Sequence, residues 1–184
     1  KYFYTGSPIT FDKVVFTGTD KAGNKLVEGE DYEIVYVDNT DAGKAHVTVV
    51  GKGNFVGTES IKKADGTTLD NVIDNDTNAA NDNANDIDFE IIGSTFSAKD
   101  ITIENGVYAS GLIVKPQVTV KVGDTTLVEG IDYELVYDTS KAIEATEEAN
   151  IRLTVKGIHK YNGVSVDRDS NGNYYVFGID KFDL

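Results

Sequence analysis

Apolar and polar residues alternate along several short stretches of the chain. Residues 31–36 (DYEIVY) place two tyrosines and an isoleucine on one face of an extended segment, and residues 115–122 (KPQVTVKV) alternate in the same way. Successive side chains of a strand point to opposite faces, so a period of two predicts half-buried β-strands. Turn-forming sequences separate these stretches, for example DKAGN at residues 20–24 and NG at residues 171–172. The pattern predicts an all-β fold.

An internal repeat is the strongest feature of the sequence. Residues 26–36 (LVEGEDYEIVY) recur as residues 127–137 (LVEGIDYELVY), and only two of these eleven positions differ. The similarity continues downstream, where residues 46–57 (HVTVVGKGNFVG) parallel residues 151–163 (IRLTVKGIHKYNG). A long repeat of this kind indicates that each copy is one structural unit.

Each copy has the length of a small β-sandwich. We therefore predict two tandem immunoglobulin-like β-sandwich modules, residues 1–95 and residues 96–184. In both modules a polar segment interrupts the last strand. The first is an Asp/Asn-rich insertion at residues 64–88, and the second is the sequence DRDSNGN at residues 167–173. We expect the first insertion to be irregular, because so polar a stretch buries too little apolar surface to offset its ordering entropy.

Composition limits the chemistry that this chain can perform. The chain has no cysteine, which excludes disulfides, cysteine nucleophiles and cysteine-ligated zinc, and its two histidines, His46 and His159, are too few for a multi-histidine metal site. The formal net charge is -14, which repels nucleic acid and anionic membranes, and no apolar run is long enough to insert into a bilayer. No nucleophile-elbow, phosphate-loop or dinucleotide motif occurs. We predict no catalytic residues and no enzyme activity.

The order of the motifs resembles a known family. The matching segments are YTGSP at residues 4–8, the repeated motif at residues 26–32, and the two stretches that follow it at residues 36–49 and 51–57. They are similar to the bacterial immunoglobulin-like repeats of Gram-positive cell-surface proteins and secreted polysaccharide-degrading enzymes. The resemblance implies a β-sandwich in an extracellular setting, either secreted or attached to the cell wall. It implies no particular ligand, and the second module matches it more loosely.

Two segments carry candidate calcium ligands, because carboxylate and amide oxygens are the ligands that this cation prefers. Their residues follow the alternating spacing of a calcium-binding loop; they are Asp167, Asp169 and Asn171 in one segment and Asp74, Asp76 and Asn78 in the other. No bidentate glutamate stands at the twelfth position of either loop. The alternatives remain open: a plain hairpin tip at residues 167–173 and a polar insertion without a bound ion at residues 64–88.

Aromatic residues are candidates for binding a glycan, because sugars stack on exposed rings. The repeated tyrosines are expected to pack in the core, since they alternate along a strand; they are Tyr32, Tyr36, Tyr133 and Tyr137. Tyr174 and Tyr175 are adjacent, so one of the two rings is expected to point outward.

Two functions are compatible with these features. The first is a structural or adhesion module that acts as a spacer or display scaffold; its partners would be neighbouring domains of the same polypeptide, and a host protein or glycan. The second is a carbohydrate-binding or accessory module of a secreted polysaccharide-active enzyme. We expect the chain to be monomeric in either case. Tandem repetition with variation in the loops favours the first function.

Overall fold

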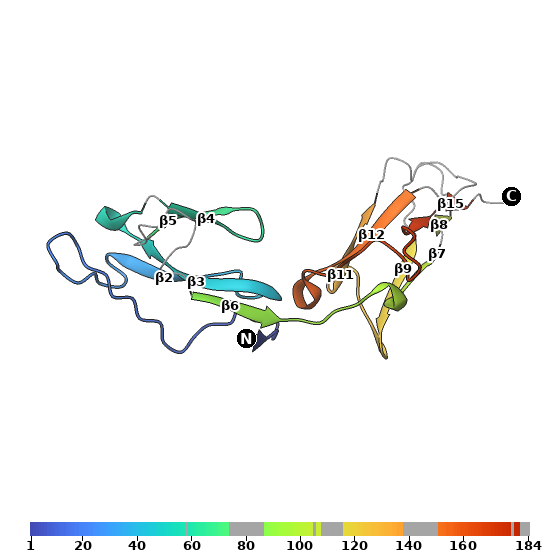
Figure 1. The fold of residues 1–184 in the computed structure, drawn as a ribbon, viewed down its shortest axis with the longest axis horizontal. Coiled ribbons are helices and arrows are strands. Elements are labelled where there is room, and N and C mark those ends of the chain that lie inside the picture. Colours follow the sequence, from blue (N-terminus) through green and yellow to red (C-terminus); the bar gives the residue numbers. More distant parts are fainter. Residues whose placement is uncertain are drawn as a thin grey trace. The chain divides into compact units, whose positions relative to one another are not determined.

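The structure, a computed structural model, describes residues 1–57, 59–73, 87–104, 106–107, 116–137, 151–177 and 179–180 (Figure 1). Its regular elements over these ranges are β-strands, with short 3-10 turns at η1 (Gly53–Phe55), η2 (Ala98–Asp100) and η4 (His159–Tyr161). The prediction of an all-β fold is confirmed. The chain divides into two compact units, Lys1–Ile92 and Gly93–Leu184, which we call unit 1 and unit 2.

Unit 1 is built around the long strand β3 (Gly43–Gly51). Strand β2 (Tyr32–Val37) pairs antiparallel with β3 along one edge, and β6 (Ile87–Ile92) pairs antiparallel with its first half along the other. The order across the sheet is β1-β6-β3-β5-β4, with β1 (Tyr2–Phe3) parallel to β6. A buried row of Ala45, Val47 and Val49 explains why β3 is central, since these side chains alternate along one face.

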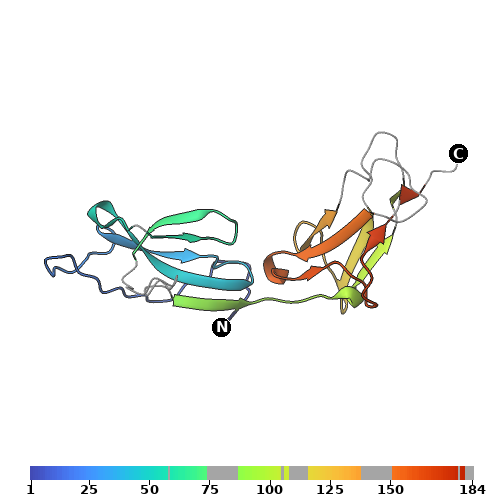
Figure 2. The ribbon, with the colours of Figure 1, turned by 45° about the horizontal axis from the view of Figure 1, so that its top comes forward.

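The N-terminal segment of unit 1 packs on this apolar face of β2 and β3. The ring of Phe16 lies 4.9 Å from the ring of Tyr32, and the ring of Phe11 lies 5.8 Å from the ring of Tyr36. The hydroxyl of Tyr36 also accepts a hydrogen bond from the N–H of Phe11 at 2.8 Å. In both ribbon views the hairpin of β4 and β5 lies on the other side of β3 from this segment (Figures 1 and 2).

Part of the segment predicted to be an irregular insertion is a strand. Strand β5 (Thr68–Val72) pairs with β4 (Glu59–Lys62), and Val72 is fully buried beside Val50 of β3. The prediction of an irregular segment at residues 64–88 is therefore wrong for β5 and for Ile87 and Asp88 of β6. Two apolar side chains, Leu69 and Val72, hold an otherwise polar strand on the sheet. Residues 74–86 lie outside the described part of the chain.

Unit 2 contains two groups of antiparallel strands. The first is ordered β10-β9-β7, with the bounds Thr125–Thr126, Gln117–Val122 and Ile101–Glu104. In the second, β12 pairs with β11, β13 and β14, whose bounds are Ile151–Gly157, Tyr133–Tyr137, Ser165–Val166 and Val176–Phe177. In addition, β8 (Gly106–Val107) pairs parallel with β15 (Ile179–Asp180).

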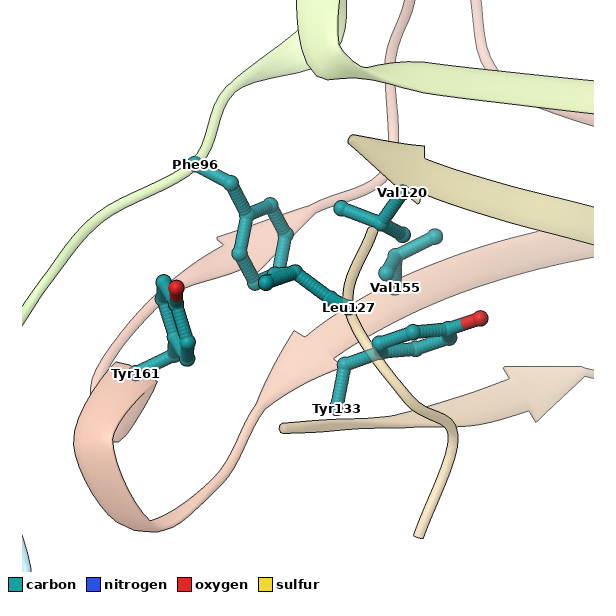
Figure 3. Packing of buried hydrophobic residues seen from close by; sticks show 6 residues of the cluster. All are labelled: Phe96, Val120, Leu127, Tyr133, Val155 and Tyr161. Atoms are coloured by element: carbon teal, nitrogen blue, oxygen red, sulfur yellow. The ribbon is translucent and has the colours of Figure 1, made fainter. Parts of the chain in front are cut away.

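The two groups of strands in unit 2 share one apolar core. Its buried residues come from the segment before β7, from β9, from the loop after β10, from the β11–β12 pair and from η4; they are Phe96, Val120, Leu127, Tyr133, Val155 and Tyr161 (Figure 3). Ile151, Leu153 and Phe177 form a second cluster, against which Ile103 packs. Burial of this apolar surface is the main force that holds the two groups of strands together.

Candidate functional site

The repeated motif forms the same closed turn in both units. In unit 1 the carboxylate of Asp31 accepts the N–H of Val27 at 2.8 Å, and the Asp31 N–H donates to the carbonyl of Val27 at 2.9 Å. In unit 2 the same two bonds join Asp132 to Val128, both at 2.8 Å. Because each carboxylate satisfies a backbone donor of its own turn, the repeated aspartate fixes the local fold.

Glycine in the repeated motif is also explained by the backbone. Gly29 and Gly130 have φ of 88° and 82°, a region that favours glycine, and each donates its N–H to the carbonyl of the tyrosine three residues later. Tyr32 and Tyr133 are themselves buried, at 5% and 3% exposure. The expectation that the repeated tyrosines pack in the core is confirmed for these two, whereas Tyr36 and Tyr137 are half-buried.

A second repeated glycine allows two segments of backbone to approach closely. A Cβ on Gly51 would lie 1.7 Å from the carbonyl oxygen of Phe55, and a Cβ on Gly157 would lie 2.2 Å from that of Tyr161. Turns η1 and η4 therefore fold back on the end of the preceding strand in the same way. His159, with φ of 49°, takes the place that Gly53 holds with φ of 55°. The turn is therefore kept although unit 2 has a histidine in place of this glycine.

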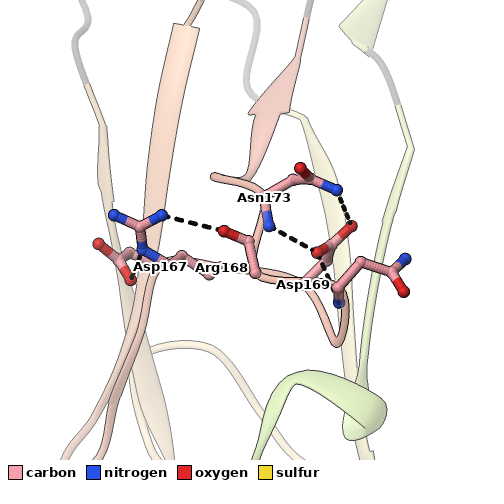
Figure 4. A network of polar contacts seen from close by, with 6 residues as sticks. Asp167, Arg168, Asp169 and Asn173 are labelled. Atoms are coloured by element: carbon pink, nitrogen blue, oxygen red, sulfur yellow. Dashed lines mark hydrogen bonds and ion pairs between the residues drawn. The ribbon is translucent and has the colours of Figure 1, made fainter.

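The candidate calcium segment at residues 167–173 is a hairpin tip closed by its own hydrogen bonds (Figure 4). One oxygen of Asp169 accepts the N–H groups of Asn171 and Asn173, both at 2.9 Å, and the other lies 3.4 Å from the side-chain amide of Asn173. The hairpin continues as an antiparallel bridge between Arg168 and Tyr174. These bonds, with that to the Asn173 N–H the strongest, lower the pKa of Asp169 below its usual value.

An independent hairpin in unit 1 shows that this turn forms with a single acidic side chain. One oxygen of Asp20 accepts the N–H groups of Ala22 and Asn24, both at 2.8 Å, and the other accepts the side-chain amide of Asn24 at 2.8 Å. The bonds from Asn24 lower the pKa of Asp20 below its usual value. Both turns have the sequence Asp-x-x-Gly-Asn, and Gly23 and Gly172 have φ of 86° and 84°. The local sequence is therefore sufficient to explain the loop.

The remaining candidate calcium ligands of this segment are Asp167 and Asn171. The carboxylate of Asp167 lies 3.9 Å from the Nε of Arg168, and Asn171 is exposed. Across the described ranges, no three His, Cys, Asp or Glu side chains are grouped so that they could hold a metal ion. Asp74, Asp76 and Asn78 lie outside the described residues.

The candidate glycan residues are already engaged within unit 2. The guanidinium carbons of Arg152 and Arg168 lie 4.1 and 3.6 Å from the ring centroid of Tyr174. Two such groups would collide over one face, so each covers one face of the ring. Tyr175 is half-buried, and its hydroxyl donates to the carbonyl of Ala98 at 3.2 Å. The exposed ring of the pair, Tyr174, has no free face for a sugar.

Sequence reasoning missed a cavity of about 220 Å³ in unit 1, whose lining side chains are mainly apolar. Residues 14–17 form one wall, Val47 and Val49 of β3 form the floor, and Ile87 of β6 completes the lining. Its lining comes from segments far apart in the sequence, residues 14–17, β3 and Ile87, so no local pattern signals it.

Comparisons with protein-family models, with curated proteins and with solved structures found no match. Within the part of the chain that the structure describes, no helix has the length and apolar character needed to cross a membrane. The case for a function therefore depends on the two units themselves.

Proposed function

We propose that the chain is a non-catalytic structural module of an extracellular bacterial protein. Its two units act as tandem immunoglobulin-like β-sandwich domains that space or display neighbouring domains of the same polypeptide. The use of the repeated residues supports this proposal. Asp31 and Asp132 bond to backbone, Gly29 and Gly130 permit a turn, and Tyr32 and Tyr133 are buried. At these positions, what the copies share serves the scaffold.

The sandwich assignment is supported by the packing of unit 2. Two groups of antiparallel strands bury one core between them, as the two sheets of an immunoglobulin-like domain do. In unit 1, β2, β3 and β6 repeat the arrangement of β11, β12 and β14. The unit sizes also fit small β-sandwiches of this type.

The pairing of the first strand with the last carries the proposal that the module bears tension. In unit 1, β1 is parallel to β6, with Tyr2 opposite Ile91 and Phe3 opposite Ile92, and the Tyr4 N–H donates to the Ile92 carbonyl at 2.9 Å. Pulling the chain apart at its two ends slides parallel strands past each other, so their hydrogen bonds are loaded together. In unit 2, β8 and β15 pair in the same parallel sense.

Single-molecule stretching of the full chain tests this function. We expect two separate unfolding events, because each unit has its own core. Tyr4→Pro removes the N–H that bonds to Ile92 and should lower the unfolding force of one event. Lys21→Pro, in the exposed turn at residues 20–24, is the matched control and should leave both forces unchanged.

Two results would argue against a tension-bearing spacer. One is that both units unfold at forces too low to resolve. The other is that the Tyr4→Pro variant unfolds at the same force as the unaltered chain. Retention of the chain on a polysaccharide gel, lost in Tyr175→Ala, would instead support the carbohydrate-binding module.

A further inference from the structure

The cavity of unit 1 borders a stretch of backbone that has no strand partner. Residues 14–17 line the cavity, yet the N–H and C=O groups of residues 12–17 make no hydrogen bond with any residue that the structure describes. Val15 is 66% exposed and Ile87 is 48% exposed, so apolar side chains border the opening. An unpaired edge beside a cavity with mainly apolar lining side chains is a template for an added strand.

The hydrogen bonds show which part of unit 2 corresponds to this edge. The Leu26 N–H donates to the Gly18 carbonyl at 3.0 Å, and its repeat counterpart Leu127 donates to the Val120 carbonyl at 2.8 Å. Gly18 therefore matches Val120, and Phe16, two residues earlier, matches Val118.

The floor of the cavity is matched in the same way. Tyr32 pairs with Gly51 as Tyr133 pairs with Gly157, so Val47 and Val49 correspond to Leu153 and Val155. The wall and the floor of the cavity therefore both have counterparts in unit 2.

In unit 2 the corresponding space is occupied by strand β7. Ile101 of β7 pairs with Val120 and packs on the cluster that contains Val155. Ile103 pairs with Val118 and packs on the cluster that contains Leu153. The site that β7 fills in unit 2 is thus the site that stands open in unit 1.

We propose that the cavity of unit 1 binds one further β-strand, whose apolar residues alternate as in β7 and which is supplied by polypeptide outside the 184 residues. The strand pairs antiparallel with residues 15–18 and inserts two alternate apolar side chains over Val47 and Val49. The lining contains no charged side chain, so apolar shape and backbone pairing select the strand.

Unit 1 also differs from unit 2 in how its wall is filled. A Cβ on Gly18 would lie 2.6 Å from the Phe16 ring, so this ring occupies the space that the Val120 side chain takes in unit 2. The exchange of a small and a large residue keeps the wall filled. The open volume thus corresponds to the space that β7 fills in unit 2, and it does not arise from a missing side chain in the wall.

A peptide with the sequence of residues 94–104 (STFSAKDITIE) tests the proposal on the full chain. We expect saturable binding, at least a tenfold slowing of amide hydrogen exchange at residues 15–18, and a higher thermal midpoint for unit 1. The control is the same peptide with both Ile101→Asp and Ile103→Asp, which should not bind. Fusing residues 93–104 directly ahead of Lys1 should raise the midpoint further, since Tyr2 and Gly106 hold equivalent places beside the last strand.

Variants of the cavity lining locate the binding. Ile87→Asp should abolish peptide binding, whereas Val136→Asp, which changes a half-exposed valine on the edge strand β11, should leave it unchanged. If Ile87→Asp does not fold by circular dichroism, Val15→Asp, at a more exposed position of the lining, replaces it. Absence of binding at millimolar peptide, equal binding of the control peptide, protection at a different strand edge, or dimerisation of the chain through its own β7 would each overturn the proposal.

Discussion

Unit 1 and unit 2 agree in one half of their structure and differ in the other. The pairs β2–β3 and β11–β12 share their register, the closed turn before them and the 3-10 turn after them. The other half of unit 2 is the sheet β10-β9-β7, whereas residues 4–31 of unit 1 form only an isolated bridge between Thr19 and Lys25 and another between Glu28 and Tyr32.

This difference shows which residues the fold constrains. In the shared half, repeated residues satisfy the backbone of their own turns, so few alternatives are allowed at those positions. In the other half, side chains only need to fill a common volume, and Phe16 with Gly18 replaces Val118 with Val120. Sequence similarity between the copies is therefore high where side chains must make specific hydrogen bonds to the backbone. It is low where side chains only need to fill a given volume.

The largest expected effect comes from the glycines that follow the central strands. Gly51→Ala and Gly157→Ala place a Cβ against a carbonyl oxygen, so the turn must move. We expect each to destabilise its own unit by about 3 kcal/mol. Urea unfolding, followed by the amide signals of each unit, measures the loss.

The control for these two substitutions is Gly66→Ala, where φ is 83° but nothing lies within 4 Å of the added Cβ. Backbone strain alone should cost it about 1 kcal/mol. Equal losses for all three variants would show that close approach does not explain the repeated glycines.

Substitution of the repeated aspartates should destabilise the chain less than the glycine substitutions do, and by the same amount in the two units. Asp31→Ala and Asp132→Ala each leave a backbone N–H of the turn without its acceptor, which we expect to cost about 1–2 kcal/mol. Thermal unfolding of each variant is the measurement. Glu30→Ala, at a position where the copies differ, is the control and should change stability little. A loss of stability in only one of the two variants would show that the two turns are not equivalent.

Threonine at one repeated strand position should distinguish the units. Thr48 and Thr154 hold equivalent places opposite Val35 and Val136, but Thr48 is fully buried while Thr154 is half-buried. Among the described residues, the hydroxyl of Thr48 has no hydrogen-bond partner. Thr48→Val should therefore stabilise unit 1 by about 1 kcal/mol, and Thr154→Val should change unit 2 little. Denaturant midpoints decide this, and a destabilised Thr48→Val would show that the hydroxyl is satisfied in solution.

Sequence alone was sufficient for the features that depend on local pattern. Alternation at residues 115–122 predicted a strand that the structure places at Gln117–Val122, and the repeat located the two β-pairs that share their register. The Asn-Gly pair at residues 171–172 predicted the hairpin tip that is observed. In each case, neighbouring residues are enough to determine the backbone.

Features that depend on distant contacts could not be predicted in the same way. Strand β5 is polar in sequence, and only its pairing with β3 and β4 reveals why Val72 is buried. The alternating oxygens at residues 167–173 fit a calcium loop by spacing, but the spacing does not show that Asp169 already accepts backbone N–H groups. The cavity of unit 1 is lined by residues 14–17, β3 and Ile87, which are far apart in the sequence and meet only in the folded chain.

The smallest expected effects concern the two hairpins with the sequence Asp-x-x-Gly-Asn. Hydrogen bonds lower the pKa of Asp20 and of Asp169 in the folded chain, so they stabilise the hairpins above the usual carboxyl pKa of about 3.9. This contribution is lost as the pH falls through the lowered values, in a window below about pH 4. Carboxyl titration by NMR should therefore give both aspartates pKa values below the usual one.

Calcium at neutral pH should leave the structure and stability of both hairpins unchanged. A calcium-dependent rise of the thermal midpoint that disappears in Asp167→Asn, with no response at Asp20, would instead assign a calcium site to residues 167–173.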